Sequence, residues 1–163
     1  MTRHLVLVRH VKSDWGSAGQ RDHDRPLNVR GRAAAKALGR WLQARGAIPD
    51  EVLCSSARRT QETCALLGLA IAPTLLKSLY LAEAHEMLAV LQGATGKAVL
   101  LLAHNPGIAE LAEEIVSAPP EHERFSDYPT GATLLARFDI TDWRDLRPGT
   151  GQIEDFVIPR DLT

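Results

Sequence analysis

The run Leu5-Val6-Leu7-Val8-Arg9-His10 decides how this chain folds. Its four apolar residues predict a buried strand, and a cation and an imidazole follow at the strand end, where α/β proteins place their chemistry. A second apolar run, residues 98–103, ends in the same way at His104-Asn105-Pro106-Gly107. Two histidines at strand ends indicate one shared site.

Length and composition limit the class of protein to which this chain can belong. The 163 residues are 45% hydrophobic and 24% charged, which predicts one globular domain over residues 1–163. Because 19 basic and 20 acidic residues give a net charge of −1, we expect no general attraction to nucleic acid or to membranes, and any anion site must be local. The two cysteines match neither a disulfide framework nor a zinc site. Without a signal peptide or an apolar run of about 18 residues, the protein is expected to be cytoplasmic.

Short apolar runs alternate with helical patterns along the chain, which is typical of an α/β fold. We expect a three-layer α/β/α domain with a mainly parallel central sheet and a site at the carboxyl ends of its strands. In the fourth helix, Asn105 is expected to cap the free amides. The expected helices cover residues 28–45, 57–67, 83–92 and 105–116, and the expected further strands cover 52–55, 133–138 and 155–158.

A third strand end carries the basic pair Arg58-Arg59. Arginine binds phosphoryl oxygens through a planar fork of donors, so Arg9 and Arg59 are candidates for a phosphate clamp. A neutral, well-oriented imidazole can attack phosphorus, which makes His10 the candidate nucleophile. His104 precedes a helix N-terminus whose free amides attract anions. Together these residues predict phosphoryl transfer, and no metal-ligand spacing is visible in the sequence.

Several motifs then match a known family across almost the whole chain. They are residues 7–10 with Lys12-Ser13 and Trp15, residues 22–27 with 30–32, residues 55–63, 104–107, 129–132 and 159–162. On these motifs the chain resembles the histidine phosphatase (phosphoglycerate mutase-like) superfamily, and most closely its short SixA-type phosphohistidine phosphatase branch.

The resemblance implies a phosphoglycerate mutase-like fold and a metal-independent phosphatase without a cofactor. It implies that His10 is phosphorylated in turnover and that Arg9, Arg59, His104 and Ser13 bind the phosphoryl group. Of the two adjacent arginines, Arg59 matches the family position four residues before a threonine.

The sequence departs from the branch at its proton donor. Leu79-Tyr80 is followed by Leu81 where relatives often carry glutamate, and Glu83 is the first candidate for the general acid, with Glu86 and Asp24 as alternatives. Imidazole leaves phosphorus more readily than an alkoxide does. The lack of a glutamate directly after Tyr80 therefore favours phosphohistidine on a protein as the substrate.

Alternatives remain for the substrate and for the entrance to the site. The same chemistry would serve a small phosphate ester such as a sugar phosphate, and an inactive module would bind phosphorylated proteins without turning them over. Trp15, His23 and Asp24 are candidates for lining the substrate entrance. The competing interpretations are structural. Trp15 would pack the loop at the active site, and His23 and Asp24 would form hydrogen bonds within that loop.

Overall fold

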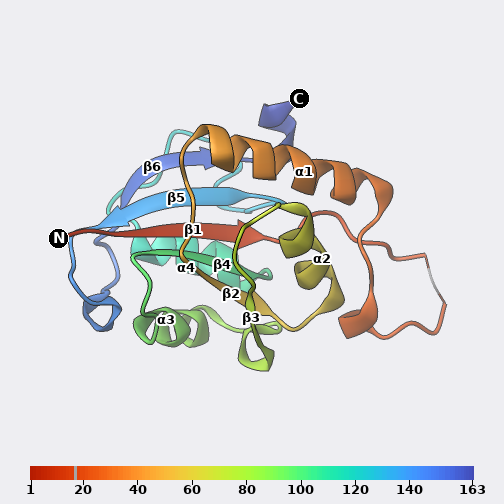
Figure 1. The fold of residues 1–163 in the computed structure, drawn as a ribbon, viewed down its shortest axis with the longest axis horizontal. Helices are drawn as coiled ribbons and strands as arrows, with labels where there is room; N and C mark the ends of the chain where they lie inside the picture. Colours follow the sequence, from red (N-terminus) through yellow and green to blue (C-terminus); the bar gives the residue numbers. More distant parts are fainter. Residues whose placement is uncertain (17) are drawn as a thin grey trace.

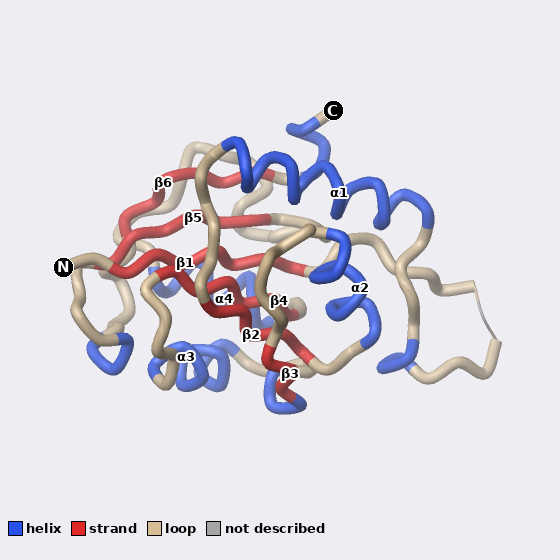
Figure 2. The backbone as a smooth tube through the Cα atoms, viewed as in Figure 1, coloured by secondary structure: helices blue, strands red, loops and turns tan. Residues whose placement is uncertain are grey.

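A computed structural model describes residues 1–16 and 18–163, and its centre is a six-stranded sheet of order β3-β2-β4-β1-β5-β6 (Figure 1). The central strand β1 is apolar on both faces because helices cover both. Figure 2 shows the strands as one continuous layer. The strands are β1 (Arg3–Arg9), β2 (Glu51–Ser55), β3 (Thr74–Leu76), β4 (Ala98–Ala103), β5 (Thr133–Phe138) and β6 (Gln152–Val157).

Two pairs of helices cover the two faces of the sheet. Val6 and Val8 pack with apolar residues of α1 (Val29–Ala44) and α2 (Arg58–Leu66). Leu5 and Leu7 point the other way and pack with α3 (Ala84–Gln92) and α4 (Gly107–Ile115). Short 3-10 helices complete the fold at η1 (Asp22–Asp24), η2 (Lys77–Leu79), η3 (Trp143–Asp145) and η4 (Pro159–Leu162). The expected three-layer α/β/α architecture is confirmed.

The expectation of a mainly parallel sheet was wrong, because the sheet is mixed. β1, β2, β3 and β4 pair in parallel, whereas β5 is antiparallel to both β1 and β6. After α4, residues 117–132 return the chain to the carboxyl end of β1, where Thr133 pairs with Val8. Since β5 starts at the end where the parallel strands finish, it runs in the opposite direction.

Local signals explain most of the helix ends. The Asn28 side chain accepts a 2.8 Å hydrogen bond from the Gly31 amide and caps α1, and Gly46 follows that helix with φ +68°. The expected cap by Asn105 was wrong: Pro106 is the N-cap of α4, the side-chain oxygen of Asn105 accepts no hydrogen bond from the described residues, and its amide nitrogen donates to the carbonyls of Asp127 and Tyr128. No helix in the described part of the chain is long and apolar enough to cross a membrane.

Candidate active site

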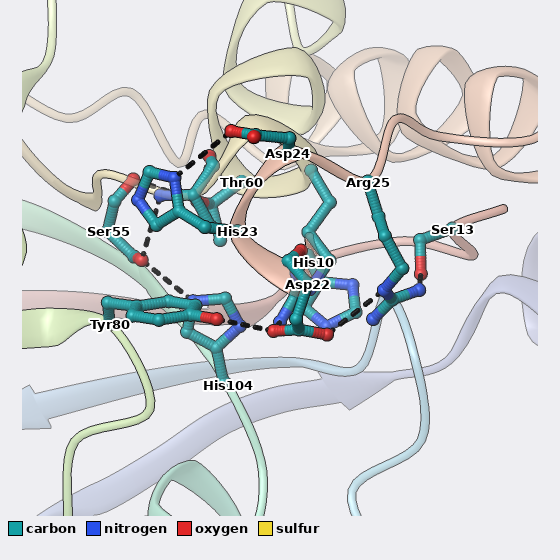
Figure 3. A network of polar contacts seen from close by, with 12 residues as sticks. His10, Ser13, Asp22, His23, Asp24, Arg25, Ser55, Thr60, Tyr80 and His104 are labelled. Atoms are coloured by element: carbon teal, nitrogen blue, oxygen red, sulfur yellow. Dashed lines mark hydrogen bonds and ion pairs between the residues drawn. The ribbon is translucent and has the colours of Figure 1, made fainter. Parts of the chain in front are cut away.

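The carboxyl ends of β1, β2 and β4 meet around a cavity of about 450 Å³. His10 follows β1, His104 follows β4, and Arg59 lies in the first turn of α2, directly beyond β2. Described residues between Lys12 and Asn28 line another side of the cavity, among them Ser13, Asp22 and Arg25 (Figure 3). The lining residues are Arg9, His10, Lys12, Ser13, Trp15, Asp22, Arg25, Asn28, Arg59, Leu81, His104, Asn105 and Thr130.

His10 is held as a neutral imidazole with one nitrogen left for chemistry. Its Nδ1 lies 2.8 Å from the Val11 carbonyl oxygen, an acceptor, so Nδ1 carries the proton and donates it. Burial is the main cause that lowers the pKa of His10 to about 3, and the charges of Arg9 and Arg59 lower it further. At neutral pH, Nε2 therefore keeps a free lone pair.

His104 lies beside His10, with 5.3 Å between the ring centroids. Its Nε2 is 2.7 Å from Ser55 Oγ, which also accepts a hydrogen bond from the Ala57 amide. A Ser55 hydroxyl that donates to Nε2 leaves the proton of His104 on Nδ1, which has no hydrogen-bond partner among the described residues. Burial, followed by the positive charge of a protonated His10, lowers the pKa of His104 to about 2. His104 is thus a neutral donor towards its surroundings.

Arginines supply the positive charge of the cavity. Arg59 is only 3% exposed, and Arg9 donates through Nη1 to the Tyr128 carbonyl at 3.2 Å. Burial lowers the pKa of the Arg9 guanidinium, and the charge of Arg59 adds to this effect. Arg25 is also buried, and its Nη1 donates to Ser13 Oγ at 2.5 Å. These side chains concentrate positive charge in a place largely shielded from water, which favours an anion.

Asp22 is the carboxylate of the cavity and binds two of those arginines. Arg59 Nη2 donates to it at 3.1 Å, Arg25 Nε at 3.0 Å and the Tyr80 hydroxyl at 2.5 Å (Figure 3). Burial raises the pKa of Asp22, but the hydrogen bonds from Tyr80 and Arg25 and the charge of Arg59 outweigh it and lower the pKa to about 2. Asp22 is therefore ionised at neutral pH and orients the guanidinium groups.

The structure brings together most of the site residues expected from the sequence. Arg9, His10, Ser13, Arg59 and His104 all line the cavity. Trp15 also lines it and is 78% exposed, and the guanidinium carbon of Arg25 lies 3.4 Å from the centre of its ring. Trp15 thus lies at the rim of the catalytic cavity.

Three other candidates lie outside the cavity lining. Glu83 is the N-cap residue of α3, where its exposed carboxylate pairs with His85 at 3.3 Å. His23 contacts Ser56 Oγ at 2.9 Å, and Asp24 is exposed. Glu83, His85 and Glu86 could together offer ligand atoms to a metal, but these exposed residues are not among those that line the cavity in the described part of the chain.

Sequence reasoning assigned no role in the site to Asp22, Arg25, Tyr80 or Asn105. The segment Asp22 to Leu27 was part of the family resemblance, and the arginine within it is the signal that could have pointed to a third cation, which the structure shows to be buried. Tyr80 gave no such signal, because its contact with Asp22 joins segments 58 residues apart.

Known proteins of similar sequence and structure identify the family of this chain. The sequence profile of the histidine phosphatase superfamily (branch 1) matches residues 5–88. An uncharacterized protein of Mycobacterium tuberculosis, Rv1276c, is 32% identical over 160 residues, covering 94% of this chain and 100% of that protein.

The chain belongs to the histidine phosphatase superfamily. The structure of a candidate phosphohistidine phosphatase SixA from Nakamurella multipartitia superposes on this histidine phosphatase with a TM-score of 0.86 and 30% identity, over 98% of this chain and 97% of that one. The structure of the protein histidine phosphatase SixA complexed with tungstate has the same fold, with a TM-score of 0.80 at 21% identity and coverage of 98% and 99%. This protein is therefore a phosphatase of the SixA type within the superfamily.

Proposed function

We propose that residues 1–163 form one domain that hydrolyses phosphohistidine on a protein through a phosphorylated His10. In the first step the bond from Nε2 of His10 to phosphorus forms while the bond from phosphorus to the substrate imidazole breaks. In the second step a water oxygen attacks phosphorus, the bond to Nε2 breaks, and inorganic phosphate leaves. Arg9 and Arg59 hold the charge of the phosphoryl oxygens in both steps.

The main support for this proposal is that no described residue lining the cavity offers a protonated carboxyl group. Among the described lining residues Asp22 is the one carboxylate, and it is ionised. An ester needs an acid to protonate its leaving oxygen, a contribution of about 10²- to 10⁴-fold in rate. An imidazole needs less help, because its second nitrogen can hold a proton as the bond to phosphorus breaks. A site without a protonated carboxyl group therefore favours phosphohistidine over an ester.

Unpartnered donors support the phosphoryl-binding roles. Within the described residues, Arg9 Nε, Arg59 Nε and His104 Nδ1 are buried and have no hydrogen-bond partner. A buried donor without a partner costs about 1–3 kcal/mol. A phosphoryl group offers three acceptor oxygens, and Arg9, Arg59 and His104 all line the cavity that would receive it.

The relatives support the same substrate class. The structure from Nakamurella multipartitia, 30% identical to this chain, is described as that of a candidate phosphohistidine phosphatase. A 2,3-bisphosphoglycerate-dependent phosphoglycerate mutase of Mesorhizobium japonicum is 46% identical, but only over 39% of this chain and 32% of that enzyme. The likeness to the candidate phosphohistidine phosphatase extends over 98% of this chain and 97% of that one, and it is therefore the stronger support.

Phosphate release tests the proposal. A histidine-phosphorylated carrier protein and a sugar phosphate are each incubated, in chelator, with the wild type and with His10→Ala. We expect phosphate from the carrier protein with the wild type and none with His10→Ala. Phosphate label on the wild-type phosphatase, once separated from the carrier protein, should be lost in acid and kept in alkali, because a phosphohistidine intermediate is labile to acid and stable to alkali.

Two other outcomes would replace the proposal. Release from the sugar phosphate alone would identify a phosphatase of small esters. Binding of the phosphorylated carrier protein without phosphate release from either substrate would identify an inactive module that recognises phosphorylated proteins.

A further inference from the structure

A second cavity, of about 730 Å³, lies between α1, residues 124–130 and the chain end at residues 158–163. Figure 1 shows this chain end beside α1. We call this cavity the basic groove. Its cationic lining residues are Lys12, Arg30, Arg40, Arg124 and Arg160.

The charge of the basic groove has a single sign. Its described lining contains no aspartate or glutamate side chain. Arg124 is paired with Asp127 at 2.9 Å, whereas the other four cations form no ion pair among the described residues. Because the net charge of the whole chain is −1, this cluster is a local feature and selects an anionic partner for this face alone.

The apolar residues that α1 contributes to the basic groove have small side chains. Ala33, Ala34 and Ala37 line it. With Arg30 and Arg40 they follow the three- and four-residue spacing of one helix face. Small side chains let another surface approach closely, and the flanking guanidinium groups would meet carboxylates at its edge. A protein surface with acidic residues around an apolar centre matches both properties, whereas a nucleic acid backbone would match only the charge.

The basic groove adjoins the catalytic cavity. Lys12 and Thr130 line both. The amide of Gly131, next to Thr130, donates to the carbonyl oxygens of Arg9 and His10 at 3.0 and 2.9 Å. Any protein that inserts a side chain into the catalytic cavity therefore lies close to the basic groove.

We propose that the basic groove binds the acidic surface of the histidine-phosphorylated protein whose phosphohistidine enters the catalytic cavity. This inference rests on the proposed function and adds to it the charge of the partner. Opposite charges on the two surfaces would act mainly on the encounter rate, which electrostatic steering raises by about 10- to 10³-fold at low ionic strength.

Two phosphohistidine peptides of equal length test the inference, one flanked by glutamates and the other by lysines. Hydrolysis of both is measured for the wild type, for Arg30→Glu/Arg40→Glu and for Lys97→Glu. Lys97 is exposed, precedes β4 and does not line the basic groove, so its reversal tests a change of charge elsewhere on the protein, by half the amount of the double reversal. Phosphoramidate, which is too small to reach the basic groove from the catalytic cavity, reports the chemical step.

We expect the wild type to prefer the glutamate-flanked peptide by about 10-fold in kcat/KM at low salt, and less at high salt. Arg30→Glu/Arg40→Glu should abolish or reverse this preference, while Lys97→Glu keeps it. Equal kcat/KM for the two peptides, or a preference that survives the double reversal, would overturn the inference and leave the proposed function intact. Failure to hydrolyse either peptide and phosphoramidate would instead remove the proposed function and this inference with it. Binding of phosphatidylserine vesicles that the double reversal abolishes, without a peptide preference, would assign the groove to membranes.

Discussion

Replacing His10 by asparagine should make the fold less sensitive to acid. Burial and the nearby arginines lower the pKa of His10 to about 3 in the folded protein, whereas an unfolded imidazole has a pKa of about 6.5. Between these two values the unfolded chain binds a proton that the folded chain does not. Stability is therefore fully present above about pH 6.5 and is lost as the pH falls towards the folded pKa.

The size of this loss follows from the two pKa values. At about pH 5 the unfolded imidazole is protonated by about 30 to 1 while His10 in the fold stays neutral, which lowers the free energy of unfolding by about 2 kcal/mol. Asparagine does not titrate, and its amide can still donate to the Val11 carbonyl that accepts from His10 Nδ1 at 2.8 Å. The substitution thus removes the titration and preserves the local hydrogen bond.

Urea unfolding at about pH 7.5 and about pH 5 measures this effect. Carboxyl groups titrate in both proteins, so they cancel in the comparison of wild type and variant. Relative to the wild type, His10→Asn should gain about 2 kcal/mol on going from the higher to the lower pH. His85→Asn, at a side chain that is 76% exposed, is the control and should show no such gain. An identical pH dependence for His10→Asn and the wild type would refute a neutral, buried His10.

Three further substitutions test the site. Arg59→Ala should lower kcat by about 10²- to 10³-fold, because it removes a charge that stabilises the transition state. The matched control is Arg58→Ala. Arg58 is exposed and pairs with Glu62 at 2.8 Å, so its loss should leave kcat nearly unchanged. Glu83→Gln should change phosphohistidine hydrolysis by less than about 3-fold, whereas a loss of about 10² would make Glu83 the general acid. Ser55→Ala should cost about 1–3 kcal/mol in urea unfolding and also lower kcat, because His104 Nε2 loses its partner at 2.7 Å; an unchanged kcat would show that the tautomer of His104 does not matter.

The sequence predicted those parts of the fold that depend on local patterns. The strand of residues 98–103 has the expected bounds, and the helix after Asn28 begins where its cap predicts. β3 has three residues and no apolar alternation, and it was not predicted. The direction of β5 could not be predicted either, because it depends on the path of the preceding loop rather than on the composition of the strand.

The same distinction holds for the site. Residues next to strand ends, such as His10 and His104, could be predicted because the polypeptide itself carries them to the edge of the sheet. Asp22 lies within a long loop, and its role depends on Arg25, Arg59 and Tyr80, whose side chains meet only in the tertiary structure. Glu83 was selected for its position in the sequence, but the helix that it caps holds its carboxylate outside the cavity lining.

The position of β1 has a consequence for the synthesis of this protein. Both neighbours of β1 come from the later part of the chain, since Leu5 pairs with Val99 on one side and with Ala136 on the other. A growing polypeptide therefore carries an unpaired apolar strand on the ribosome until most of the chain has emerged. Such pairings between distant segments fold slowly and expose strand edges to aggregation. Nascent chains stalled before residue 133 would lack the second partner of β1 and should depend on chaperones to stay dispersed.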